Sequence, residues 1–283
     1  MGEEKSAAPV ALVTGASRGV GKGVATALGA AGWTVYVTAR GGTAPTDPLG
    51  QTVAAVNTAG GTGFGVRCDH SDDGAVASLF GTISAEQGRL DLLVNNAWAA
   101  PKGFGGFSDK FWERPVSDWD TLITVGLRAH YVACVHAAQL MVPQGHGLMV
   151  NISSFGTRGH LHSVLYGMSK AALDKMAFDM GHELAGTGVS AISLWLGLIQ
   201  TELLLSLGID QFAGFKIGEA EHPEFVGRVI DRLWRDSDLD KRNGHTLVTA
   251  ELGADYGLAN NDGVVPKSHR APFGGGPLFP PAH

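Results

Sequence analysis

The stretch VALVTGASRGVGKGVATALGAAG, residues 10–32, decides the fold of this chain. It opens with a short apolar run, passes through Gly15, Gly19 and Gly21 in the pattern T-G-x-x-x-G-x-G, and continues with small and apolar residues at helical spacing. Glycines at such a turn let backbone amides and the helix N-terminus approach a phosphate group, because no side chains stand between them. The stretch therefore predicts a strand, a dinucleotide-binding turn and a helix.

The rest of the chain repeats this alternation of strand and helix. Strand-like apolar segments lie at 33–40, 91–97, 147–154 and 188–197, and helix-like segments lie at 72–88, 117–142 and 166–186. Apolar strands flanked by glycine are typical of a parallel sheet that is covered on both faces. We predict one α/β domain over residues 1–263, a Rossmann-type doubly wound parallel sheet with helices on both faces. The Pro- and Gly-rich tail, 264–283, is expected to be irregular or to cover a neighbouring surface.

Composition excludes several classes of function. The chain has 283 residues and a net charge of -6, so it lacks the basic surface that a nucleic-acid partner requires. No apolar run reaches the roughly 18 residues of a membrane span. Two cysteines are too few for a disulfide framework and favour a reducing compartment. We expect a cytoplasmic protein with no membrane span.

The end of the second predicted strand favours NADP(H) over NAD(H). Ala39 stands where an NAD site usually has an acidic residue, and Arg40 follows it. Arg18, in the glycine turn, can add a second guanidinium to the additional phosphate of NADP(H). Asp69, after the third strand, could accept from the adenine amino group, and Asn95 could hold either the central sheet or the adenosine ribose. Each of these two could equally cap a turn.

The segment YGMSK, residues 166–170, follows shortly after NISS, residues 151–154. Tyr166 and Lys170 are about one helical turn apart and would share one face of a helix. A cation beside a phenol favours the phenolate and lowers the pKa of the tyrosine. The alternative is an ordinary helix start with a buried aromatic residue and a solvated lysine.

Together these segments resemble the short-chain dehydrogenase/reductase superfamily over roughly residues 8–250. The resemblance depends on TGASRGVG, NNA, NISS, YGMSK and LGLIQTEL in this order. Within the superfamily, VGLRAHY, LMVPQGHG, SLWLGLIQTEL and the late YGL and NDG are similar to the dehydrogenase/reductase member 1 type. The resemblance implies an oxidoreductase that moves a hydride between a nicotinamide and a carbonyl or secondary alcohol, and a homodimer or homotetramer assembled through the fourth and fifth helices.

The resemblance also implies residue roles. Tyr166 would be the general acid or base, and Lys170 would lower its pKa and bind the nicotinamide ribose. Either Ser154 or Ser153 would hold the substrate oxygen: the strand register favours Ser154, whereas counting back from Tyr166 favours Ser153. The expected cofactor contacts are Gly15, Ser17, Arg18, Gly19, Val20, Gly21, Arg40, Asp69, Asn95, Ala97, Tyr166, Lys170 and Thr201.

Three positions depart from the family pattern. Trp98 replaces the glycine of NNAG, Gly126 replaces the asparagine of a proton relay, and Leu196 replaces the proline after the sixth strand. Either an ordered water or His130, one turn beyond Gly126, could replace the relay, although an ordinary core or surface histidine is the simpler interpretation of His130. Because the Ser, Tyr and Lys set is complete, we expect reduced rather than lost activity.

The glycine- and aromatic-rich segment 101–115 suggests an apolar substrate, such as a steroid, a retinoid-like or xenobiotic ketone, or a fatty aldehyde. The aromatic residues near it form either a substrate wall or core packing; they are Phe104, Phe107, Phe111, Trp112 and Trp119. Two other functions stay open: a non-catalytic NADP-binding scaffold, and an isomerase or dehydratase that returns the borrowed hydride. A hydrolase is disfavoured because no nucleophile elbow is present. The sequence also predicts no metal site.

Overall fold

The centre of the molecule is a seven-stranded sheet in the order β3-β2-β1-β4-β5-β6-β9, and every neighbouring pair is parallel. The structure is a computed structural model that describes residues 7–101 and 109–275. The strands are β1 (Val10–Val13), β2 (Thr34–Ala39), β3 (Thr62–Arg67), β4 (Leu92–Asn95), β5 (Gly147–Ser154), β6 (Val189–Leu196) and β9 (Thr246–Val248). The predicted doubly wound parallel fold is confirmed.

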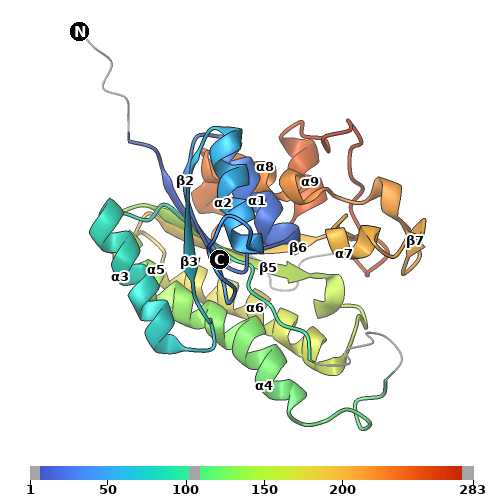
Figure 1. Cartoon of the computed structure of the whole chain (residues 1–283). Coiled ribbons are helices and arrows are strands. Elements are labelled where there is room, and N and C mark those ends of the chain that lie inside the picture. Colours follow the sequence, from blue (N-terminus) through green and yellow to red (C-terminus); the bar gives the residue numbers. More distant parts are fainter. Residues whose placement is uncertain (1–6, 102–108, 276–283) are drawn as a thin grey trace.

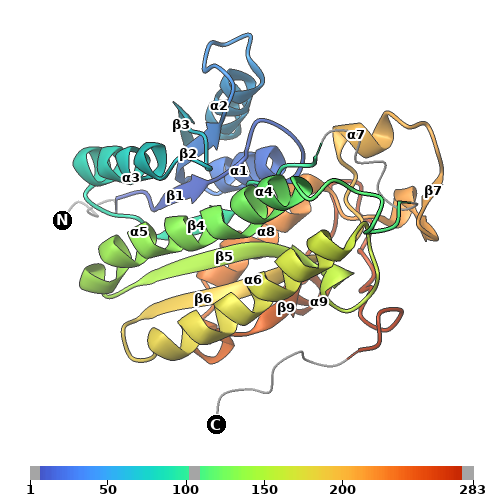
Figure 2. The same ribbon diagram turned by 90° about the horizontal axis from the view of Figure 1, so that it is seen from below.

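Helices cover both faces of the sheet (Figures 1 and 2). One face carries α1 (Gly19–Ala30), α2 (Pro48–Ala59), α8 (Pro223–Trp234) and α9 (Thr249–Asp255). The other carries α3 (Asp73–Gln87), α4 (Asp118–Ile123), α5 (Ala129–Gln144) and α6 (Val164–Glu183). Successive strand residues point to opposite faces, so Ala11 and Val13 join the first core while Val10 and Leu12 join the second.

Two regions differ from the expected helices. The predicted helix 117–142 contains a π-helical segment, Thr124–Arg128, between α4 and α5. Segment 202–222 contains the short α7 (Glu202–Leu205) and a hairpin of β7 (Gln211–Phe212) and β8 (Phe215–Lys216). Residues 264–275 form neither helix nor strand. None of the described helices is long and apolar enough to cross a bilayer, and Cys68 and Cys134 are buried, unpaired thiols.

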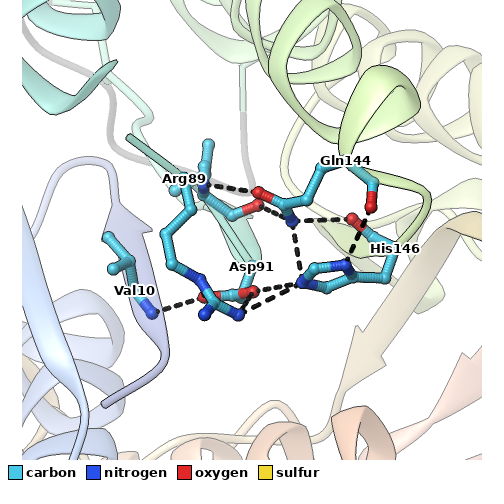
Figure 3. A network of polar contacts seen from close by, with 6 residues as sticks. Val10, Arg89, Asp91, Gln144 and His146 are labelled. Atoms are coloured by element: carbon cyan, nitrogen blue, oxygen red, sulfur yellow. Dashed lines mark hydrogen bonds and ion pairs between the residues drawn. The ribbon is translucent and has the colours of Figure 1, made fainter. Parts of the chain in front are cut away.

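A buried carboxylate ties the amino ends of the central strands together (Figure 3). Asp91, just before β4, accepts from the Val10 amide at 2.7 Å and from Arg89 Nε and Nη2 at 2.9 and 2.6 Å. His146 Nε2, just before β5, lies 2.7 Å from the same carboxylate. The Asp91 side chain is fully buried, so its bonds replace the water that it loses on folding.

Replacing Asp91 with alanine is expected to lower the free energy of unfolding by about 3–5 kcal/mol, because the Val10 amide and the Arg89 guanidinium lose their partner. The measurement is denaturant unfolding. The matched control is Asp238→Ala, which removes an exposed ion pair and is expected to cost at most about 1 kcal/mol. Equal losses in the two variants would contradict a structural role for the Asp91 network.

Candidate active site

The glycine turn lies at the carboxyl end of β1 and packs closely on the end of β4. Gly15 has a φ of +65°, and a Cβ atom there would lie 2.7 Å from Ala97 Cα. Thr14 Oγ1 accepts from the amides of Asn96 and Ala97, each at 2.9 Å. Asn96 Nδ2 donates to the carbonyls of Thr14 and Gly15 at 2.9 and 3.0 Å. These contacts fix the shape of the turn.

A cavity of about 150 Å³ lies beside this turn, at the carboxyl ends of β1 to β4. Six of the expected cofactor contacts line it: Gly15, Ser17, Arg18, Arg40, Asp69 and Ala97. Within residues 7–101 and 109–275, neither Arg18 nor Arg40 forms an ion pair. Two exposed guanidinium groups beside a glycine turn fit a phosphate-bearing ligand.

The first amide of α1 already binds an anionic group. Gly19 N donates to Glu202 Oε2 at 2.9 Å, and Thr201 Cγ2 lies 3.5 Å from the position of a Gly19 Cβ. Thr201 is the N-cap of α7, where its Oγ1 accepts from the Leu204 amide at 3.3 Å. The Gly19 amide is therefore a donor to an anionic group, a position that the Glu202 carboxylate takes in this structure.

Some of the expected cofactor contacts have structural partners within the protein, and three of them, Val20, Gly21 and Asn95, do not line the cavity. Asn95 bridges β4 and β5 through Asn151 Oδ1 at 3.0 Å, which matches the first of its two interpretations. Gly21 packs on Asn96, because a Cβ there would lie 2.5 Å from Asn96 Nδ2, and Val20 packs on the core. Asp69 lines the cavity but also caps a turn, since it accepts from the Ser71 amide and hydroxyl at 3.0 and 2.7 Å.

Ser154, Tyr166 and Lys170 come together at the carboxyl end of β5. The Tyr166 hydroxyl donates to Ser154 Oγ at 2.9 Å. Lys170 Nζ lies 5.7 Å from the centre of the Tyr166 ring and donates to the Ile152 carbonyl at 2.8 Å. Ser163 caps the helix, because its Oγ accepts from the Tyr166 amide at 3.2 Å. The cap places Tyr166 in the first turn of α6, facing the end of the strand.

The two serines point to opposite sides of β5, as neighbours on a strand must. Ser153 is buried, and its hydroxyl donates to the Lys170 carbonyl at 3.3 Å. Ser154 Oγ accepts from Tyr166 and from the Gly156 amide at 3.1 Å. Of the two alternatives that the sequence left open, only Ser154 lies beside the tyrosine hydroxyl.

Burial controls the ionisation of this cluster. Burial raises the pKa of Tyr166 above its usual value, and the hydrogen bond with Ser154 opposes this shift. Burial lowers the pKa of Lys170 to about 8, against the raising effect of Asp174. Loss of solvent around the phenol therefore opposes the depression of the Tyr166 pKa that the sequence predicts from Lys170.

The sequence and its relatives agree with this geometry. A model of the short chain dehydrogenase family matches residues 9–211. The chain belongs to the short-chain dehydrogenase/reductase family. Dehydrogenase/reductase SDR family member 1 of Mus musculus is 42% identical over 271 residues, which cover 92% of this chain and 85% of the relative. The Homo sapiens protein of the same name is 43% identical over 265 residues, which cover 90% and 83%. The resemblance to the member 1 type is therefore confirmed.

Solved structures share the fold. A metagenomic short-chain oxidoreductase in complex with NADP has a TM-score of 0.67 and 28% identity, covering 82% of this chain and 92% of that chain. A variant of actinorhodin polyketide ketoreductase with NADPH has a TM-score of 0.73 and 25% identity, covering 85% and 95%.

Two departures of this short-chain dehydrogenase/reductase from the family pattern explain each other. A Cβ atom on Gly126 would lie 3.1 Å from Trp98 Cδ1, so the Trp98 indole fills the space above the π-helical segment. An asparagine at position 126 would therefore require this indole to shift. Trp98 also meets the Tyr166 ring edge-on, with 6.1 Å between centroids.

His130 is buried, and its Nε2 lies 2.9 Å from the Ala97 carbonyl. Burial lowers the pKa of His130 to about 3. A neutral histidine that anchors the end of β4 matches the structural interpretation rather than a proton relay. The third departure, Leu196, is buried in the core, and Glu221 accepts from the neighbouring Gly197 amide at 2.9 Å.

A second cavity, of about 130 Å³, opens at Ser154 and Tyr166 of this short-chain dehydrogenase/reductase. Its walls include His162, which meets the Tyr166 ring edge-on at 4.7 Å between centroids. Sequence reasoning missed His162, and its spacing gave no signal. His162 has a φ of 60°, a strained conformation that is common at functional sites.

Among the described residues of the expected aromatic set, none lines this cavity. Phe104 and Phe107 lie outside the described residues. Phe111 and Trp119 line a separate cavity over the start of α6, and Trp112 is exposed. The aromatic residues at the Ser154 cavity come instead from elsewhere in the chain: Phe155, Phe212, Phe215 and Phe273.

Proposed function

We propose that this protein is an NADP(H)-dependent carbonyl reductase, also able to oxidise secondary alcohols in the reverse direction. The observation that carries the proposal is the 2.9 Å contact between the Tyr166 and Ser154 hydroxyls, at the mouth of an apolar cavity. The arginine-lined cavity beside the glycine turn supports the cofactor assignment.

A bound nicotinamide supplies the hydride for reduction or accepts it in the reverse reaction. Tyr166 holds the proton that the carbonyl oxygen receives, and its raised pKa keeps it protonated near neutral pH. Ser154 holds the substrate oxygen through its own hydroxyl proton. The ammonium of Lys170 favours release of the phenolic proton at the moment of transfer. The protonated phenol suits reduction, in which it acts as the acid, whereas oxidation requires the phenolate as base.

Arg18 and Arg40 support NADP(H) over NAD(H). Both side chains are exposed at the cavity, where planar guanidinium groups can bind the phosphate that distinguishes the two cofactors. Ala39 at the end of β2 offers no carboxylate to ribose hydroxyls. The solved neighbours in complex with NADP or NADPH fit this preference.

Ser154→Ala is expected to lower kcat for carbonyl reduction by about 10²–10³-fold, because one donor to the developing negative charge is lost. The matched control is Ser153→Ala on the other side of β5, which should keep kcat close to that of the wild type. Initial rates of NADPH oxidation check both variants. A large loss of kcat in Ser153→Ala, with kcat unchanged in Ser154→Ala, would assign the catalytic hydroxyl to Ser153.

Carbonyl reduction is expected to slow as the pH rises through about 8, the pKa of Lys170. Below this pH the ammonium is charged and assists proton release from Tyr166; above it the amine is neutral and that assistance is lost. The measurement is kcat between pH 6 and 10. In Lys170→Arg the guanidinium stays charged across this range. The residual kcat of this variant should therefore show no decline near pH 8. A decline that persists in this variant would point to another group.

Exposed apolar side chains support a homodimer or homotetramer through α5 and α6. Tyr131, Val135 and Val142 on α5 are exposed, as are Val164 and Met168 on α6. Apolar residues gathered on neighbouring helices are typical of an interface between subunits. Light scattering after size-exclusion chromatography tests the assembly, and a purely monomeric protein would contradict it.

The function is tested by NADPH oxidation with the purified protein across a panel of ketones, aldehydes and quinones. The proposal predicts stoichiometric conversion of at least one carbonyl to its alcohol. NADPH binding without any turnover would support the scaffold alternative. Substrate conversion without net NADPH consumption would support the isomerase or dehydratase.

A further inference from the structure

The C-terminal tail returns to the cavity at Ser154 and Tyr166. The ring of Phe273 stacks on Phe155 with 5.2 Å between centroids and an interplanar angle of 22°. Its place is shaped by Gly159, where a Cβ atom would lie 2.4 Å from Phe273 Cδ1. Phe155 itself is buried and packs edge-on against Trp195 of β6 at 4.9 Å. The tail ring therefore rests on a rigid part of the core.

A second tail residue joins the tail to the hairpin. His269 stacks on Phe215 of β8, with 3.9 Å between centroids and an interplanar angle of 16°. Phe215 is also stacked on Phe273 at 6.2 Å. Phe155, Phe215, His269 and Phe273 thus form one set of packed rings, which we call the aromatic wall. Two of its four members belong to the tail.

Polar contacts hold the tail in place on either side of this wall. Arg270 forms two hydrogen bonds with Glu251 of α9, Nε–Oε1 at 2.8 Å and Nη2–Oε2 at 2.6 Å. Lys267 Nζ donates to Glu219 Oε2 at 2.9 Å. Arg158 donates to the Gly274 carbonyl at 3.4 Å. A segment with neither helix nor strand is thereby bound to the body at three separate places.

We propose that Phe273 and His269 set the upper size of the substrate and restrict this site to uncharged carbonyl compounds with a single ring. This size limit rests on the proposed reductase function, because it presupposes that the cavity binds the carbonyl substrate. It assigns to the tail a specificity role in the cavity that Ser154 and Tyr166 also line.

The size of the cavity decides the substrate class. It measures about 130 Å³, whereas an apolar cavity of roughly 150 Å³ accommodates one benzene molecule and pockets for drug-sized ligands begin near 300 Å³. With the tail in place, the volume of this cavity corresponds to about one ring. The steroid and retinoid-like compounds expected from the sequence exceed this volume.

The chemistry of the walls decides the charge of the substrate. Apart from the hydroxyl groups of Ser154 and Tyr166, the described walls are mainly aromatic and aliphatic. Burial lowers the pKa values of His162 and His269, so both are neutral near pH 7. None of the described lining residues would then pair with a carboxylate on the ring, and the loss of its water would cost free energy.

The test compares benzaldehyde with 2-naphthaldehyde, which carry the same carbonyl on one ring and on two. We expect the wild type to favour benzaldehyde in kcat/KM. Phe273→Ala is expected to raise the ratio of kcat/KM for naphthaldehyde to kcat/KM for benzaldehyde by at least about tenfold, because changes in the size of an apolar pocket alter discrimination by this amount. Arg270→Gln, which loosens the tail without changing the wall, should shift the ratio in the same direction. The matched control is Val265→Ala, an exposed tail residue, with an unchanged ratio.

A ratio that is equal in all four proteins, or a wild type that reduces both aldehydes equally well, would overturn the size limit and leave the reductase assignment intact. Calorimetric binding of benzyl alcohol and 2-naphthylmethanol to the protein with NADP⁺ gives a readout that needs no turnover. If neither aldehyde is reduced but Phe273→Ala gains affinity for the naphthyl alcohol, the reductase assignment fails and the size limit holds.

Discussion

Tyr166→Phe is expected to lower kcat for ketone reduction by about 10²–10⁴-fold, the usual contribution of a general acid. The substitution removes only the hydroxyl that lies 2.9 Å from Ser154 Oγ and keeps the ring that Trp98 and His162 contact. NADPH binding should persist, because the glycine turn and both arginines are untouched. Initial rates and fluorescence titration with NADPH measure the two quantities.

The matched control is Tyr131→Phe, which removes an exposed hydroxyl from α5 and should leave kcat unchanged. Ketones are the decisive substrates, since quinones can accept a hydride without a protein acid. A Tyr166→Phe variant that reduces ketones at the rate of the wild type would show that another group donates the proton.

The double variant Arg18→Ala, Arg40→Asp is expected to lower the preference for NADPH over NADH by about 10²-fold or more. Each charge-assisted bond to phosphate contributes about 1.5–3 kcal/mol, and the new carboxylate at the end of β2 can accept from ribose hydroxyls. The measurement is the ratio of kcat/KM for NADPH to that for NADH with one aldehyde.

Arg235→Ala, just after α8, is the control for this pair, because Arg235 is an exposed arginine that pairs with Asp231 and does not line the cavity beside the glycine turn. Its cofactor ratio should equal that of the wild type. A double variant that keeps the full NADPH preference would contradict the assignment of Arg18 and Arg40 to the phosphate.

Most of the sheet follows from the sequence, because buried parallel strands are apolar and bounded by glycine. Strand β9 was not predicted, because TLV, residues 246–248, is too short for a periodic signal. Helix α8 carries an amphipathic pattern in PEFVGRVIDRLW that the prediction did not use. The interruption of the predicted helix 117–142 by a π-helical segment could not be foreseen, since helical spacing gives no signal for it.

The site was predicted in its components but not in its packing. The sequence identified Tyr166, Lys170 and the glycine turn, and it left the choice between Ser153 and Ser154 to the structure. Spacing gives no information on desolvation, so the raised pKa of Tyr166 was missed. Thr14 and Asn96 stand within the quoted motifs, yet their role in holding the turn depends on contacts between β1 and β4. The tail reaches the cavity through contacts between segments far apart in sequence, which no local pattern encodes.

The central claim is that a hydride passes from a nicotinamide to a carbonyl carbon in this site. The most direct test is to supply NADPH carrying deuterium at the transferable C4 position, together with benzaldehyde, and to weigh the alcohol by mass spectrometry. The account predicts one deuterium per molecule of alcohol in the wild type and little or no alcohol in Tyr166→Phe. Alcohol formed without deuterium, while the labelled cofactor is consumed, would contradict direct hydride transfer.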